Sequence, residues 1–318
     1  MFQRRMKPAL PYRRVRAFYC DHFVLPLPEG HRFPMSKYRL LRERVLAEGI
    51  VATADLQEPD AAPWDALRLV HTHDYITGVA HGTLPPQIQR RIGFPWSPAM
   101  VERARRSVGG TIAAARVALI EGAAANLAGG THHSFADRGE GFCVFNDIAV
   151  AARLLLHERR INRVLVIDLD VHQGNGTAAI FADDPAVFTF SVHGASNFPF
   201  HKEISDLDIP LPDGTCDDEY LEIVERHVPA LLAQERPDLV FYLAGADPYE
   251  GDRLGKLKLT IEGLRARDAL VFGACRAAGL PVALSMGGGY AHDVDAIVRI
   301  HANTIREAAA HVALSSPG

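Results

Sequence analysis

The chain has 318 residues, of which 48% are hydrophobic and 23% are charged, which is the composition of a globular protein with a large buried core. The formal net charge of -4 builds in no bulk attraction to nucleic acid or to an anionic membrane surface, so we expect no direct contact with nucleic acid. No apolar run approaches the roughly 18 residues that a spanning helix needs, which argues against membrane insertion.

Basic residues are concentrated in the first sixteen positions, and no apolar stretch of signal-peptide length follows them. The 4 cysteines are far apart in the sequence and form no CxxC pair, so reduced thiols are expected. We therefore predict a cytoplasmic protein with a basic N-terminal arm at residues 1–16 and one domain at residues 17–318. The role of the arm and the oligomeric state are left open.

Short apolar runs and helical patterns alternate along the chain. In chain order they predict a strand at 16–22, helices at 36–48 and 97–121, strands at 125–132, 163–172 and 186–193, a helix at 217–235, a strand at 238–247, a helix at 260–278 and a strand at 281–290. A glycine, or in one case the pair Arg236-Pro237, follows each helix and signals its end. We predict an α/β fold, namely a single-domain open, mostly parallel β-sheet flanked by helices on both faces.

Polar side chains follow the predicted strands at the points where these strands end. His132 and His133 follow one strand, Asp247 ends another, and Tyr290 follows a third. In an open parallel sheet, ligands bind beyond the carboxyl ends of the strands, where the connecting loops converge. We therefore expect these side chains to share one site.

The run from Asp168 through Asp170 to His172 places these residues at i, i+2 and i+4 of an extended segment, where side chains share a face. Buried carboxylates and an imidazole would be costly together unless a cation joins them. Catalytic zinc takes three protein ligands and keeps a fourth position for water. Asp170, His172 and Asp247 are therefore candidate ligands of one zinc ion, and a hydrogen-bonded polar strand end is the alternative for the run alone.

Two further motifs offer proton transfer and oxyanion stabilisation. His132 and His133 follow a glycine pair, so one imidazole could take a proton from water while its neighbour stays charged. Tyr290 follows three glycines and could donate a hydrogen bond to a developing oxyanion. Each motif also has a plainer interpretation, as a surface histidine pair and as a flexible turn with an incidental aromatic residue.

Together these pieces resemble the zinc-dependent histone deacetylase family, which has the arginase/deacetylase fold. The resemblance extends from about Ala17 to near the C-terminus, so residues 17–318 would form a deacetylase domain. Finer features at 137–139, 172–176 and 250–255 resemble the class IV branch and its bacterial relatives. The motifs that carry the family resemblance lie at 30–35, 71–75, 130–133, 139–143, 168–176, 245–247 and 287–290.

The resemblance implies a role for each matched residue. Asp170, His172 and Asp247 would bind the zinc ion. His133 would be the general base and later the general acid, with Asn175 behind it, and His132 would assist electrostatically, with Asp168 behind it. Tyr290 would polarise the substrate carbonyl. An acyl-lysine tunnel would be lined by Gly141, Phe142, Phe198, Leu254 and Gly288. Potassium would lie beside the zinc at Asp168, Asp170, His172, Ser191 and Val192, and a second potassium at Phe181, Asp184 and Val187.

The chain departs from the best-known class I pattern in two places. That class has an aspartate where this chain has Asn175, and a neutral amide raises an imidazole pKa less than a carboxylate does. His133 should therefore more readily be neutral and able to act as a base. The segment 80–98 contains no Asp or Glu, although class I enzymes use an acidic residue near there to clamp the substrate backbone.

The implied function is hydrolysis of the amide bond of N-ε-acyl-lysine in a protein or peptide by metal-activated water, with hydroxamate-type inhibitors expected to bind. Alternatives are removal of long fatty acyl groups, as the class IV resemblance suggests, and acetylpolyamine hydrolysis. The latter is disfavoured because Leu254 stands where an acidic gatekeeper is expected. A non-catalytic acyl-lysine binding module is also disfavoured, because the tyrosine and both histidines are present. The acyl-chain length, the physiological substrate and the choice between zinc and iron stay open.

Overall fold

The structure is a computed structural model that describes residues 14–23, 25 and 27–314. Most of the predicted basic arm, with Arg4, Arg5, Lys7 and Arg13, lies outside the described residues. Val15 is fully buried, and Arg16 is the first residue of strand β1. The division of the chain at residue 16 stays a prediction.

One 8-stranded sheet organises the molecule, with the strand order β2-β1-β3-β8-β7-β4-β5-β6. Its neighbouring strands all pair in parallel, which confirms the predicted parallel α/β fold. The strands are β1 (Arg16–Phe18), β2 (Leu56–Gln57), β3 (Ala123–Asn126), β4 (Val164–Asp168), β5 (Val187–Gly194), β6 (Leu207–Leu211), β7 (Leu239–Gly245) and β8 (Val282–Gly287).

Sequence analysis missed the two edge strands of the sheet, β2 and β6. The first has only 2 residues, and the second contains Pro210, which lacks a backbone N–H and is tolerated in a sheet mainly at an edge. Neither segment has the unbroken apolar pattern of the central strands, because an edge strand is only half covered. Short, half-exposed strands therefore leave too weak a pattern to recognise.

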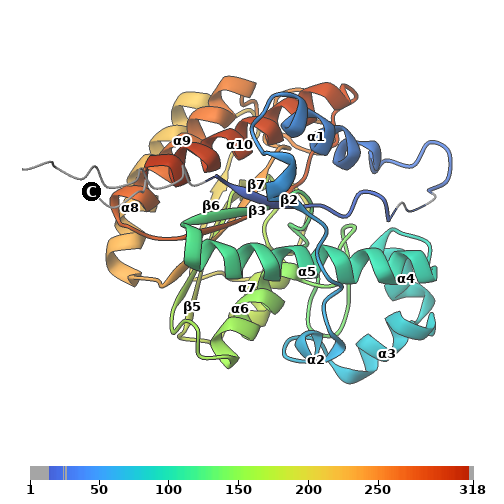
Figure 1. Ribbon diagram of the computed structural model, residues 1–318. Coiled ribbons are helices and arrows are strands. Elements are labelled where there is room, and N and C mark those ends of the chain that lie inside the picture. Colours follow the sequence, from blue (N-terminus) through green and yellow to red (C-terminus); the bar gives the residue numbers. More distant parts are fainter. Residues whose placement is uncertain (1–13, 24, 26, 315–318) are drawn as a thin grey trace, which may run out of the picture.

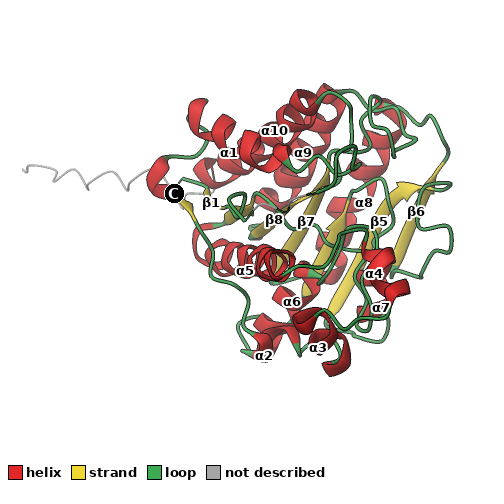
Figure 2. Ribbon diagram, turned by 90° about the vertical axis from the view of Figure 1, so that its right-hand side faces the viewer, coloured by secondary structure: helices red, strands yellow, loops and turns green. Residues whose placement is uncertain are grey.

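Helices cover both faces of the sheet, as predicted (Figures 1 and 2). One layer holds α1 (Ser36–Ala47), α8 (Asp217–Glu235), α9 (Ile261–Ala277) and α10 (Val294–Leu314), and the other holds α5 (Pro98–Glu121), α6 (Asp147–His157) and α7 (Asn175–Phe181), with α2 (Trp64–Leu67), α3 (His73–His81) and α4 (Pro86–Ile92) beyond them. A short 3-10 turn, η1, spans Thr53–Asp55. No helix of the described part of the chain combines the length and the apolarity needed to cross a membrane.

The central strands are buried on both faces, which explains their unbroken apolar sequences. Side chains alternate between the two faces along each strand. In β4, Leu165 and Ile167 belong to the core beneath α8, α9 and α10, whereas Val164 and Val166 belong to the core beneath α5 and α6. The sheet is therefore a rigid scaffold with a buried apolar interior, and it positions the loops at its carboxyl edge.

The predicted strand 163–172 is too long, because β4 ends at Asp168. Asp170 and His172 lie in the loop that follows, so the prediction that these residues share one strand face is wrong. The loop is held in place by Arg267 of α9, which is fully buried and donates from Nη1 to Leu169 O at 3.2 Å and to Gly245 O at 2.7 Å. This contact ties the ends of β4 and β7 together beneath the site.

Candidate metal centre and active site

Asp170, His172 and Asp247 converge at the carboxyl ends of β4 and β7. Their potential ligand atoms all lie within 4.8 Å of one another, and all three side chains are buried. His172 Nδ1 lies 2.9 Å from Asp170 Oδ1 and 3.2 Å from Asp247 Oδ2. The structure thus brings together the three residues that the sequence singled out.

The carboxylate of Asp247 shows that this cluster fits a cation. Its Oδ1 accepts a hydrogen bond from Val171 N at 3.0 Å, but its buried Oδ2 has no partner with hydrogen-bond geometry among the described residues. A buried carboxylate oxygen without a donor is costly unless a cation completes it. One imidazole with two carboxylates is also a donor set that catalytic zinc uses.

The electrostatics of the cluster favour positive charge. Burial alone lowers the pKa of His172, but the carboxylates of Asp170 and Asp247 more than offset it and raise that pKa to about 10. Burial, reinforced by the charge of Asp170, raises the pKa of Asp247. Two buried carboxylates share one imidazole, so the cluster keeps an excess of negative charge that a cation would offset.

His132 is paired with a carboxylate. Its Nδ1 lies 2.6 Å from Asp168 Oδ2, and Asp168 is the last residue of β4. Burial lowers the pKa of His132, but Asp168 and Asp170 outweigh burial and raise the pKa to about 9. His132 therefore carries a positive charge at neutral pH.

His133 is paired with an amide instead. Its Nδ1 lies 2.7 Å from Asn175 Oδ1, and Asn175 Nδ2 donates to Glu140 Oε1 at 2.7 Å. Because the amide N–H is used on Glu140, the amide oxygen faces the ring and His133 Nδ1 is the donor, which leaves Nε2 with a free lone pair. Burial, with the neighbouring charges of His132 and His172, lowers the pKa of His133 well below its usual range. The two adjacent histidines are thus held in opposite protonation states.

Tyr290 is held beside the cluster by its own backbone. Tyr290 N donates to Asp252 Oδ2 at 2.6 Å, and Tyr290 O accepts from Arg253 Nε at 2.5 Å. The ring centroid lies 6.4 Å from that of His172. Burial, together with the charges of Asp247 and Asp170, raises the pKa of the Tyr290 phenol well above its usual range, so the hydroxyl stays protonated and can donate.

Lys37 was not predicted as a site residue, although it follows the motif at 30–35. It is buried, and Nζ donates to Gly288 O and, at 3.3 Å, to Gly289 O. Nζ also lies 5.1 Å from the centroid of the Tyr290 ring. Burial lowers the pKa of Lys37 to about 8, although the negative charge of Asp247 acts to raise it. Lys37 therefore braces the glycine turn that carries Tyr290.

The predicted tunnel residues surround two connected spaces. The wider one, here called the mouth, is a cavity of about 780 Å³ that reaches His133, His172 and Tyr290. Gly141, Phe142, Phe198 and Leu254 line the mouth, whereas Gly288 lines a smaller inner pocket with His132 and Asp170.

The narrow part of the mouth depends on Gly141. Its φ is +57°, and a Cβ there would lie 2.5 Å from His133 Cδ2 and 3.3 Å from Phe198 Cε1. A side chain at this position would therefore press on the imidazole of His133 and close the space between His133 and Phe198. The Phe198 ring stands edge-on to that of His133, with centroids 4.9 Å apart.

The residues expected to bind potassium fall into two places. Ser191 and Val192 lie on β5 beside the end of β4, where Ser191 is the register partner of Asp168 and its Oγ contacts His193 Nδ1 at 3.0 Å. At the end of α7, Asp184 N donates to Phe181 O at 2.9 Å and Val187 N donates to Asp184 O at 3.1 Å. Both potassium sites stay predictions.

A parallel α/β sheet with a buried His-Asp-Asp cluster at its carboxyl edge defines a class, that of α/β proteins with a candidate site for a single metal ion. Comparison with known proteins narrows this class. A family model described as the histone deacetylase domain matches residues 31–306. The chain therefore belongs to the histone deacetylase family, a family of hydrolases with the arginase/deacetylase fold.

Individual relatives agree with this assignment. The chain is 51% identical to an uncharacterised protein of Picosynechococcus sp., covering 89% of this chain and 94% of that protein. It is 32% identical to histone deacetylase 2 of Arabidopsis thaliana (88% and 76% covered) and 36% identical to the acetoin utilization protein AcuC of Bacillus subtilis (72% and 65% covered). A crystal structure of a histone deacetylase homologue from Aquifex aeolicus superposes with a TM-score of 0.80 at 25% identity, covering 93% of this chain and 84% of that chain. A homologue complexed with SAHA gives a TM-score of 0.79 at the same identity and coverage.

Proposed function

We propose that this protein hydrolyses the amide bond of N-ε-acyl-lysine in a protein or peptide, with one zinc ion held by Asp170, His172 and Asp247. The observation that carries the proposal is the buried Oδ2 of Asp247, which accepts no hydrogen bond from a described residue and belongs to a His-Asp-Asp cluster that has His133 and Tyr290 at its side. Zinc bound there supplies a Lewis acid that lowers the pKa of water toward neutrality and polarises a carbonyl.

Three side chains beside the metal cluster would take separate roles in the reaction. His133 is neutral and presents Nε2 to the cavity, so it takes a proton from water as general base and later returns the proton to the leaving amine. His132 stays charged through Asp168 and stabilises the negative charge that develops nearby. The protonated phenol of Tyr290 donates a hydrogen bond to the oxyanion.

The charges of the mouth argue against an acetylpolyamine substrate. Its lining holds Arg32, Arg91, Arg138 and Lys256 against Glu140 and Glu203, and the apolar Leu254 stands where acetylpolyamine hydrolases would carry an acidic gatekeeper. A second ammonium group on the substrate would be disfavoured by this excess of positive charge and by the missing carboxylate at position 254. An acyl-lysine side chain carries no such charge next to its amide.

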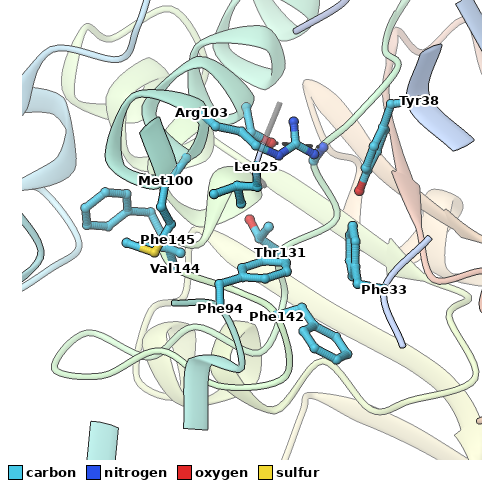
Figure 3. Close-up of a pocket in the computed structure, with 13 residues that line it drawn as sticks. Leu25, Phe33, Tyr38, Phe94, Met100, Arg103, Thr131, Phe142, Val144 and Phe145 are labelled. Atoms are coloured by element: carbon cyan, nitrogen blue, oxygen red, sulfur yellow. Dashed lines mark hydrogen bonds between the residues drawn. The ribbon is translucent and has the colours of Figure 1, made fainter. Parts of the chain in front are cut away.

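A chamber behind the site bears on the length of the acyl group. It is lined mainly by apolar side chains and shares Phe33, Gly129 and Phe142 with the inner pocket (Figure 3). Its volume is about 40 Å³, and one water needs about 10–15 Å³ by the same measure, so there is room for about three water-sized groups. Short acyl groups therefore fit better than the long fatty acyl groups of the alternative hypothesis.

The proposal is tested by measuring kcat/KM on one peptide that carries acyl-lysine from acetyl to myristoyl, with acetylpolyamines alongside. We expect turnover of short acyl groups that stops after chelation and returns on addition of zinc. Preferred cleavage of myristoyl-lysine would replace short-chain hydrolysis with fatty deacylation. Bound zinc without turnover of any acyl-lysine would overturn the proposed reaction.

A further inference from the structure

Arg103 of α5 places a permanent positive charge in the wall of the chamber behind the site. Its side chain lines the chamber with Tyr38, Ser107 and Thr131, and only 7% of its surface is exposed. In the part of the chain that the structure describes, no carboxylate lies within ion-pair distance of Arg103. Arg103 Cζ lies 4.6 Å from the centroid of the Tyr38 ring, and Arg103 Nη1 lies 3.8 Å from Cys20 Sγ.

A buried guanidinium without an anion is an unusual arrangement. Arginine does not lose its charge in proteins, so burial cannot be relieved by deprotonation. An aromatic face and a thiol compensate only part of the cost, and buried charges are otherwise paired. By contrast, Arg267, the largest fully buried side chain, is paired with Asp268 at 2.8 Å. Among the described residues, Arg103 therefore lacks a carboxylate partner such as the one that Asp268 provides for Arg267.

The surroundings of Arg103 suit a carboxylate. Lys37 Nζ also lies over the Tyr38 ring, 5.3 Å from its centroid, so two cations lie close to this ring. Ser107 Oγ accepts from Gly129 N at 3.1 Å, which leaves its O–H available as a donor. Figure 3 shows the Arg103 side chain reaching toward Tyr38 above the rings of Phe33 and Phe94.

The position of the chamber connects this charge with the acyl group. The chamber and the inner pocket, which contains His133, Asp170 and His172, share Phe33, Tyr38, Gly129, Thr131 and Phe142 as walls. An acyl group whose carbonyl lies at the metal cluster would extend its far end into the chamber. A neutral chain would leave the Arg103 charge buried against methyl groups, whereas a terminal carboxylate would neutralise it.

We propose that Arg103 forms a carboxylate subsite and that the enzyme therefore accepts lysine acylated with a short dicarboxylic acid, such as succinyl- or glutaryl-lysine. This inference rests on the proposed acyl-lysine hydrolysis. A carboxylate has three non-hydrogen atoms, which match the room for about three water-sized groups in the chamber, so the methylene groups of the acyl chain would lie in the adjoining inner pocket. Arg103 acts on specificity through the far end of the acyl chain and takes no part in the proton transfers.

The test compares a carboxylate with its uncharged isostere. Peptides carrying glutaryl-lysine and the corresponding primary amide are assayed, with acetyl-lysine as reference, for the wild-type enzyme and for Arg103→Met, Arg103→Lys and Arg116→Met. Arg116 is the matched control, because it lies on the same helix but is exposed and paired with Glu158. Zinc content and melting temperature are measured for each variant.

We expect the wild type to prefer glutaryl-lysine to its amide by about 10-fold to 100-fold in kcat/KM, which is the usual range for a hydrogen bond to a charged group. Arg103→Met should abolish this preference while acetyl-lysine turnover changes less than about twofold, and Arg103→Lys should retain part of it. Arg116→Met should behave as wild type. The melting temperature of Arg103→Met should not fall, because an unpaired buried charge is replaced by an apolar chain.

The outcomes separate this inference from the proposed reaction. Turnover of acetyl-lysine with no preference for the carboxylate would overturn the subsite and leave the reaction intact, whereas no turnover of any acyl-lysine would overturn the reaction itself. The released acid could also supply a carboxylate, so inhibition by free acetate is measured in parallel. If Arg103→Met weakened acetate inhibition but left the preference for glutaryl-lysine unchanged, Arg103 would be refuted as the subsite for the acyl carboxylate, and the released acid would be the anion that binds Arg103.

Discussion

Replacing Asn175 with aspartate would place a carboxylate behind the proposed general base. Asn175 Oδ1 lies 2.7 Å from His133 Nδ1, so the new negative charge would lie about 4 Å from the centre of an imidazolium charge. At an effective dielectric constant of about 20, a pair at that distance interacts by about 4 kcal/mol, or about 3 pKa units. Because the Glu140 carboxylate beside it opposes ionisation of the new aspartate, we expect a rise of about 1–3 units in the pKa of His133.

The sign of the effect on activity follows from the role of His133. Burial holds the pKa of His133 well below its usual range, so His133 is neutral at pH 7 in the wild type. The enzyme should lose activity only as the pH falls and His133 becomes protonated. A raised pKa moves this acid limb to higher pH. Because kcat/KM falls about tenfold for each pH unit below the pKa of the general base, Asn175→Asp should lower kcat/KM on the acid side of the pH profile.

The assay is the pH dependence of kcat/KM on an acetyl-lysine peptide, with zinc content verified at each pH. Wild-type and Asn175→Asp rates should converge on the alkaline side. The double variant Asn175→Asp/Glu140→Gln is the control, because an amide at position 140 can donate to the new carboxylate and removes the repulsion. An acid limb at the same pH in wild type and Asn175→Asp, with zinc bound in both, would refute His133 as the base.

The other predictions test single contacts of the site and of its support. Tyr290→Phe should lower kcat about a hundredfold to a thousandfold while zinc content and binding of the hydroxamate inhibitor SAHA are retained, and unaltered kcat would exclude the phenol as oxyanion donor. Asp247→Asn should reduce bound zinc well below one per chain by elemental analysis, and full occupancy would show that Asp247 is not a ligand. Arg267→Met should lower the free energy of unfolding in denaturant by about 3–5 kcal/mol, because it leaves Asp268 buried without its partner, and Arg267→Met/Asp268→Leu should recover much of this loss. A loss below about 1 kcal/mol for the single variant would contradict this account.

The sequence alone was sufficient to predict the fold class and most of its central elements. A strand that is covered on both faces needs an unbroken apolar run, such as the one in β7. The glycine after α5 signals the end of that helix, and this signal does not depend on where the helix packs. These are local requirements, so they are visible without knowledge of the partner segments. The polar residues after the strands were predictable for the same reason, because parallel strands of one sheet present their carboxyl ends at one edge.

Only the tertiary structure decided which of these residues meet and what surrounds them. Asp170 and His172 were expected on a strand face, but they lie in a loop that Arg267, about a hundred residues away, ties to β7. Nothing in the sequence indicated that Glu140 accepts a hydrogen bond from Asn175 or that Arg103 lies in the chamber wall, because each looks like an ordinary surface charge. The sequence gives the charge of a side chain. Its burial and its partner depend on contacts between distant segments, and these contacts exist only once the chain has folded.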